Sequence, residues 1–207
     1  MILKLWYYEE KITKQENDME HVEPIRDRKK INAMKKYLKG SRTRDWCLFV
    51  LGINSGLRIS DLLRLTVGDV LNERGQIKAR ISLREKKTGK SKNFPISDTA
   101  KKAILEYLED TSGINYDAPL FMSRKGGESI KRNQAYKVIN AAARVVGIRD
   151  RIGTHSLRKT FGYHAYQKGI DLSILQKIFN HAAPSVTLRY IGITQDDMDE
   201  VYLNLNL

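Results

Sequence analysis

The sequence has very little cysteine and no long apolar run. Of its 207 residues one is a cysteine, Cys47, which excludes an internal disulfide and any zinc site built from several cysteines. Because Cys47 lies in an apolar run, we expect a buried, unreactive thiol. That run, from Trp46 to Ile53, is the longest in the chain and is far below the roughly 18 residues that a membrane span needs. No secretory signal pattern is present, so we expect a cytoplasmic protein that contacts no membrane.

Positive charge is in excess and is unevenly distributed. The chain carries a formal net charge of +13, but residues 1–24 carry −3, which leaves +16 for the remainder. The last stretch, 195–207, has four acids and no base. A basic middle of this kind favours a polyanionic partner, nucleic acid above all. The alternative is a solvated basic surface that serves solubility.

Apolar periodicity predicts a mostly helical chain with one small antiparallel sheet, an α+β fold. An arm over 1–23 precedes one domain over 24–207, whose tail is 194–207. Strict alternation over 76–83 predicts a strand, and a shorter alternation at Phe94 and Ile96 predicts its hairpin partner. Helices are expected over residues 24–40, 44–55, 60–65, 98–108, 129–146, 154–168, 172–179, from 184, and from 194. Ser60, Thr154 and Asp171 are expected N-caps.

The helix expected over 154–168 carries the first candidate chemistry. His155 and Arg158 are three residues apart, so their side chains project together near a helix N-terminus, where anions are favoured. The pair could bind a phosphate. Alone it is a weak signal, because a surface His-x-x-Arg pair often occurs by chance.

Other residues add to this pair, although each has a simpler interpretation. Arg58 follows a glycine break, but it could be an ordinary surface arginine. His181 ends a predicted helix and could be a helix-end cap, and Tyr190 could be a half-buried aromatic residue. The predicted hairpin is rich in bases and contains one acid, Glu85.

In order, the chain shows Gly56-Leu57-Arg58-Ile59-Ser60-Asp61, Lys87-Thr88-Gly89-Lys90, His155-Ser156-Leu157-Arg158, Asn180-His181 and Tyr190. This order and spacing resembles the catalytic domain of the tyrosine recombinase (phage integrase) family, in its short integrase-like form, from about Val22 to Tyr190. The resemblance implies a site-specific recombinase of DNA that needs no metal and no ATP, and no cofactor is expected.

The resemblance also implies a role for each matching residue. Tyr190 is the expected nucleophile, which becomes a 3′-phosphotyrosine, and Arg58 and Arg158 are expected to bind the nonbridging phosphate oxygens. Lys87 is expected to protonate the departing 5′ oxygen, with Lys86 as the alternative.

The two histidines complete the expected catalytic set: His155 for base or proton-handling work, and His181 as a contact to the phosphate. Guanidinium groups bind phosphate oxygens bidentately and keep their proton at neutral pH, which suits this chemistry. Asp61, where the family often has Glu, is expected to support the Arg58 loop, and Asn180 stands where the family often has Gly. The expected DNA contacts are basic residues of the hairpin and those that precede or open the long helix expected over 129–146: Arg84, Lys86, Lys90, Lys92, Arg124, Lys125, Lys131 and Arg132.

Double-stranded DNA is therefore the expected partner, in the bacterial nucleoid. Typical members carry a core-binding domain ahead of the catalytic one, and the two form a clamp around DNA, whereas here only a short acidic arm precedes the catalytic domain. Three interpretations stay open: a minimal recombinase, a fragment that lacks the core-binding domain, or an accessory protein that supplies the second half of the clamp. The tail 194–207 is expected to mediate self-assembly on DNA, unless it folds back on its own domain. Two other functions stay open: a type IB topoisomerase, and a non-catalytic DNA-binding regulator descended from a recombinase.

Overall fold

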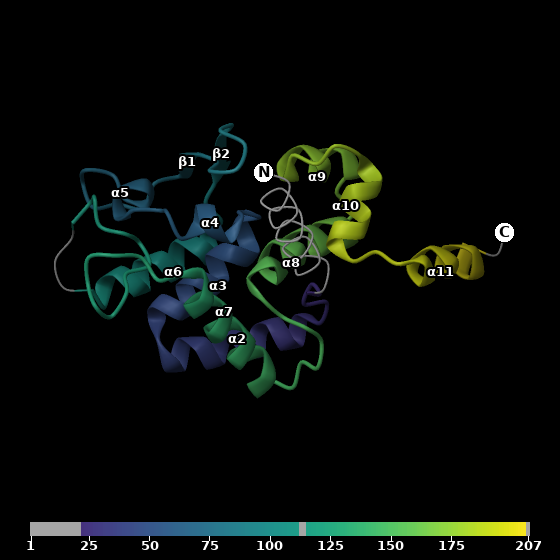
Figure 1. Cartoon of the computed structure of the whole chain (residues 1–207), viewed down its shortest axis with the longest axis horizontal. Helices are drawn as coiled ribbons and strands as arrows, with labels where there is room; N and C mark the ends of the chain where they lie inside the picture. Colours follow the sequence, from purple (N-terminus) through teal and green to yellow (C-terminus); the bar gives the residue numbers. More distant parts are fainter. Residues whose placement is uncertain (1–21, 112–114, 206–207) are drawn as a thin grey trace, which may run out of the picture.

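The computed structural model describes residues 22–111 and 115–205, which form a mostly helical fold with one two-stranded antiparallel sheet (Figure 1). The predicted arm over 1–23 lies outside these residues, apart from its last two. The elements follow one another as α2 (Arg28–Ser41), α3 (Thr43–Ser55), α4 (Ile59–Leu62), α5 (Val67–Val70), β1 (Arg80–Arg84), β2 (Ser91–Pro95), α6 (Asp98–Glu109), α7 (Arg132–Val145), α8 (Thr154–Gln167), α9 (Leu172–Phe179), α10 (Pro184–Ile191) and α11 (Gln195–Leu205).

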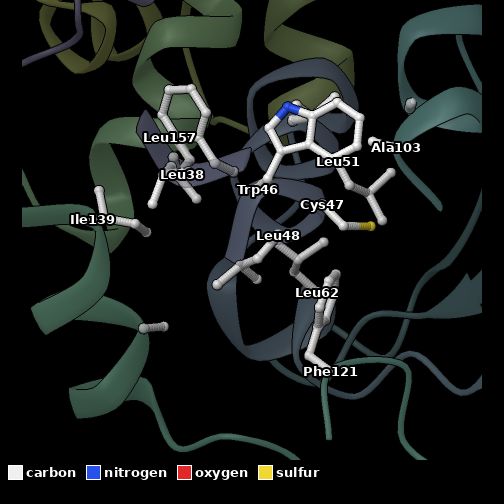
Figure 2. Close-up of a cluster of buried hydrophobic side chains, with 14 of the residues drawn as sticks. Leu38, Trp46, Cys47, Leu48, Leu51, Leu62, Ala103, Phe121, Ile139 and Leu157 are labelled. Carbon is white, nitrogen blue, oxygen red and sulfur yellow. The ribbon is translucent and has the colours of Figure 1, made fainter. Parts of the chain in front are cut away.

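Helix α3 is the centre of the hydrophobic core. Its residues from Trp46 to Leu51 are at most 7% exposed, as expected for a helix that is apolar on nearly every side. Helices α2, α6, α7 and α8 pack around it, and Figure 2 shows Leu157 of α8 among the side chains of this cluster. Burial raises the pKa of the Cys47 thiol, which agrees with the expected unreactive cysteine.

The sheet is smaller than the alternation predicts. Strands β1 and β2 pair with Ile81 opposite Phe94. Ile77, which precedes β1, forms only an isolated bridge to Leu71. Ile81 is fully buried against the core, so one face of the hairpin is anchored while its tip extends into solvent. The hairpin therefore carries its basic residues beside the helical body.

Two predicted helix starts and one predicted N-cap were wrong by one or two residues. Arg58, not Ser60, precedes α4, and α7 begins at Arg132 rather than just after Ser129, whose backbone pairs with Met122 instead. Gly153, not Thr154, is the N-cap of α8, and the Ser156 hydroxyl accepts its backbone N–H. Asp171 caps α9 as expected.

Helix α11 extends away from the body of the protein in Figure 1. Thr194 caps it through a reciprocal pair of bonds with Asp197. None of its residues is buried. Among the described residues, no helix is both long and apolar enough to cross a bilayer.

Candidate active site

Arg158 is a buried arginine held between two distant parts of the chain. It is 2% exposed, and its Nη2 donates to the carbonyl of Phe179 at 2.8 Å while its Nη1 donates to the carbonyl of Gly56. The Phe179 ring lies beneath the guanidinium, 4.5 Å from its carbon. Gly56 has φ +59°, a conformation that favours glycine, and this turn ends α3 immediately before Arg58. Arg158 thus fixes the end of α9 against the end of α3.

Arg58, which precedes α4, brings a second guanidinium to the Phe179 carbonyl. Its Nη1 forms an ion pair with Glu85 Oε2 at 2.8 Å, and its Nη2 lies 3.5 Å from the carbonyl oxygen of Phe179. Both predicted arginines therefore converge on the Phe179 carbonyl, although they are 100 residues apart in the sequence.

Tyr190 projects from α10 into this pair of arginines. Burial raises the pKa of its hydroxyl, and the positive charges of Arg158 and Arg58 oppose that rise. Its ring contacts His181 at 4.9 Å and Phe179 at 5.5 Å between centroids. The Lys159 ammonium lies 5.5 Å from the Tyr190 ring centroid. The tyrosine hydroxyl is therefore protonated at neutral pH in a strongly positive environment.

Both predicted histidines are neutral at pH 7. Burial, followed by the charges of the nearby Arg132 and Lys159, lowers the pKa of His155 to about 4. Arg132 Nη2 lies 3.1 Å from His155 Nε2, and because a guanidinium can only donate, Nε2 is the accepting nitrogen. Burial, Arg158 and Arg58 likewise lower the pKa of His181 to about 4. Of the two imidazoles, that of His181 lies against the Tyr190 ring, whereas that of His155 contacts Arg132.

His181 is placed by the unusual backbone of its neighbour. Asn180 ends α9 with φ 53°, a left-handed conformation that asparagine tolerates better than most residues other than glycine. This explains why Asn can occupy a position where Gly is frequent. His181 Nδ1 lies 3.1 Å from the Thr187 hydroxyl, which fixes the ring against α10.

The hairpin brings its lysines to the edge of the site. Lys87 is exposed at the turn between β1 and β2, next to the exposed Lys86. Lys90 Nζ donates to Asn180 Oδ1 at 2.6 Å, and Lys92 Nζ donates to the Ile178 carbonyl at 3.3 Å. Burial, followed by the charge of Arg158, lowers the pKa of Lys92 to about 8. Sequence reasoning assigned Lys92 only to DNA contact, whereas the structure places its ammonium among the site's own charges.

Two buried carboxylates connect the hairpin to the Arg58 turn. Asp61 is 2% exposed and its Oδ1 accepts the backbone N–H of Lys86 at 2.9 Å, so it links the two loops. Glu85 is 5% exposed and pairs with Arg58. Sequence reasoning gave Glu85 no role, although its position as the one acid in a basic hairpin was a usable signal.

The remaining predicted DNA contacts lie at the start of α7, on the hairpin and in the turn 123–128. Arg132 reaches the site through His155, and a polar cleft of about 640 Å³ beside it is lined by Arg132, Arg144 and Arg151. Arg84 is exposed on the hairpin, with Nε donating to the Gly89 carbonyl at 2.6 Å. Lys131 is also exposed, at the start of α7.

Arg124 and Lys125 are exposed in the turn between Ser123 and Glu128, whose backbone groups are hydrogen-bonded to each other. This turn is part of the loop that precedes α7 and does not belong to the hairpin.

Residues 26–196 match the model of the phage integrase family. The chain belongs to the phage integrase family. It is 45% identical over 184 residues to the probable integrase/recombinase YoeC of Bacillus subtilis, which covers 89% of this chain and 97% of that protein.

Solved recombinase structures share the fold of this integrase-family chain. The crystal structure of XerA recombinase matches with a TM-score of 0.72 at 21% identity, covering 90% of this chain and 65% of that one. XerH recombinase, bound to palindromic difH substrate in a post-cleavage complex, matches with a TM-score of 0.68 at 20% identity, covering 90% and 54%. The chain thus spans less than two thirds of these two recombinases. The findings confirm the resemblance, the predicted fold and the predicted class of enzyme, a site-specific recombinase.

Proposed function

We propose that this chain breaks and rejoins DNA through a 3′-phosphotyrosyl intermediate on Tyr190. The observation that carries the proposal is that Arg58 and Arg158 both reach the carbonyl of Phe179, whose ring packs against the Tyr190 ring at 5.5 Å between centroids. The charges of both guanidinium groups oppose the rise in the pKa of the Tyr190 hydroxyl. Two planar cations beside a nucleophile match a phosphodiester, whose oxygens gain negative charge in the transition state. Each guanidinium has five N–H donors, so donors beyond those bound to backbone carbonyls are available to phosphate oxygens.

Cleavage then follows from the roles of the surrounding side chains. The Tyr190 oxygen attacks the phosphorus, its proton passes to His155, and the P–O5′ bond breaks. The electron pair leaves with O5′, which takes a proton from Lys87, and His181 contacts a phosphate oxygen. The new tyrosyl phosphodiester retains the energy of the broken one, so the free 5′ hydroxyl of another strand can reverse the step. No metal and no ATP enter this sequence, and EDTA should leave adduct formation unchanged.

A covalent-adduct assay tests the proposal. Nicked duplexes from the DNA flanking the protein's own gene release the short cleaved strand, so the adduct accumulates and migrates slowly on a denaturing gel. Wild type should form the adduct and Tyr190→Phe should not. Tyr37→Phe, which alters an exposed tyrosine of α2, is the matched control and should behave as wild type.

Three results would contradict the proposal. An adduct that persists in Tyr190→Phe would contradict the nucleophile. DNA binding without any adduct would support the regulator instead, and relaxation of supercoils without strand exchange would support a topoisomerase.

DNA lies across the hairpin, the site and the start of α7 in this proposal. Removing one phosphate-binding side chain should reduce the slope of log affinity against log salt by about 0.9. We expect Lys86→Gln and Lys131→Gln each to reduce it by that amount in a band-shift titration. Arg124→Gln and Lys125→Gln report whether the turn 123–128 also touches the backbone; an unchanged slope for all four variants would contradict this placement.

Helix α11 supplies the contact between protomers on DNA. Its apolar side chains are exposed to between 44% for Met198 and 82% for Tyr202, a degree of apolar exposure that is typical of an interaction surface. Deleting the chain beyond Gly192 should reduce cooperative assembly on paired sites and leave single-site binding unchanged. Equal cooperativity with and without the tail in a band-shift titration would contradict this role.

The DNA-cleaving domain comprises residues 24–207, and the protein works on the bacterial nucleoid in the cytoplasm. A second DNA-binding element, from an accessory protein or a further domain, completes the clamp. Adding such a partner should increase the affinity of the chain for one site.

A further inference from the structure

The turn that carries Lys87 is anchored on both sides. On one side the Lys86 backbone N–H donates to Asp61 Oδ1 at 2.9 Å. On the other, the Thr88 hydroxyl donates to Glu85 Oε2 at 2.7 Å. Both acceptors belong to carboxylates that are at most 5% exposed, whereas Lys87 itself is exposed. The backbone on either side of Lys87 is thus held by buried groups while its side chain projects outward.

One oxygen of Glu85 contacts both the Lys87 turn and Arg58. The Oε2 that accepts the Thr88 hydroxyl also pairs with Arg58 Nη1 at 2.8 Å. Burial alone would raise the pKa of Glu85, but the Thr88 hydroxyl and the positive charges of Arg58 and Lys92 outweigh it and lower the pKa, so the carboxylate is charged at neutral pH. The position of the Lys87 turn is therefore coupled to the position of the Arg58 guanidinium.

We propose that Glu85 and Thr88 are positioning residues that fix the Lys87 turn relative to Arg58. The group that protonates O5′ and the guanidinium that binds the phosphate are thereby held at a fixed distance from each other. The inference rests on the proposed function, since it gives Lys87 the task of protonating O5′. Thr88 acts only on the turn, and Glu85 acts on both the turn and Arg58.

A change of leaving group separates this role from a structural one. In the natural substrate the P–O5′ bond breaks and the alkoxide must take a proton from Lys87. When sulfur replaces O5′, the P–S bond breaks and a thiolate leaves without a proton, because a thiol has a pKa near 8.5. A variant that impairs only proton transfer from Lys87 should therefore cleave the sulfur substrate at the wild-type rate. A variant that impairs the whole site should cleave both substrates slowly.

The test measures single-turnover adduct formation on both substrates. Thr88→Val removes the hydroxyl and keeps the shape, and we expect it to slow cleavage of the oxygen substrate by roughly 10- to 100-fold, as for a 1 Å misplacement. On the sulfur substrate its rate should stay within about threefold of wild type, and Lys87→Ala should show the same pattern. Thr88→Ser, the matched control, keeps the hydroxyl and should restore cleavage of the oxygen substrate. Glu85→Gln should slow both substrates, because Arg58 serves both.

The outcomes distinguish this inference from the function on which it rests. Equal slowing of both substrates by Thr88→Val, or no slowing of either, overturns the positioning role while wild-type adduct still supports the recombinase. No adduct from wild type on either substrate overturns both. Urea unfolding of each variant accompanies the kinetics, and a Thr88→Val variant as stable as wild type that slows only the oxygen substrate establishes the role.

Discussion

A methyl group added at Gly162 should displace Tyr190, the proposed nucleophile, without touching it. Gly162 is on α8 where α9 and α10 cross, and a Cβ there would lie 2.6 Å from both Ile191 Cγ2 and Phe179 Cε2. Carbon atoms in ordinary contact are about 3.5–4.0 Å apart, so the side chains of Ile191 and Phe179 must move by about 1 Å. Because both are fully buried, we expect the helices that carry them to move with them. Those helices carry Tyr190 and the Phe179 carbonyl that binds Arg158.

The expected magnitudes follow from the same geometry. Overpacking costs about 1–3 kcal/mol, and replacing a helical glycine by alanine returns up to about 1 kcal/mol. We therefore expect Gly162→Ala to lower the free energy of unfolding by about 1 kcal/mol. A shift of about 1 Å at Tyr190 should slow adduct formation by about 100-fold.

Gly40→Ala is the matched control for Gly162→Ala. It makes the same change near the end of α2, where an added Cβ would meet nothing within 4 Å. It should raise the free energy of unfolding by about 0.5–1 kcal/mol and leave the adduct rate unchanged. The two variants are compared by urea unfolding and by single-turnover adduct formation. If Gly162→Ala is stabilised as much as Gly40→Ala and cleaves at the wild-type rate, the packing argument is refuted.

Three further predictions concern the charges of the site. Arg158→Lys keeps the charge but cannot reach the Gly56 and Phe179 carbonyls together, so single-turnover adduct formation should fall by about 10²–10³-fold; a fall below tenfold would contradict it. NMR titration of the free protein should place the midpoints of His155 and His181 near 4, with the His155 midpoint rising in Arg132→Met; a midpoint near 6.5 in wild type would contradict the burial argument. Since a histidine in the unfolded chain titrates near 6.5, the unfolded chain binds more protons than the folded one between pH 6.5 and 4. The free energy of unfolding should therefore fall as the pH is lowered through that window. It should fall less in a variant in which glutamine replaces both histidines.

Local features of the sequence were enough for most of the fold. The apolar run from Trp46 to Ile53 predicted the buried α3, and Asp171 predicted the start of α9. Both depend on residues within one or two turns of each other, which sequence periodicity reports directly. Helix α5 and the true starts of α4 and α7 were missed. Contacts from outside α5 help to hold it in place. Residues 67 and 68 of α5, for example, donate backbone bonds to Ala118 and Tyr116.

The sequence by itself determined which chemical groups are available: arginines, histidines, a basic hairpin and a tyrosine, in an order that identified the family. Only the tertiary structure decided how they meet. Arg158 binds the carbonyl of Gly56, which is 102 residues away, and Glu85 joins Arg58 to the Lys87 turn. The lowered pKa values of both histidines and the raised pKa of Tyr190 likewise arise from burial among distant charges. Solvent exclusion and Coulomb energy depend on distance in space, and separation along the chain does not report that distance.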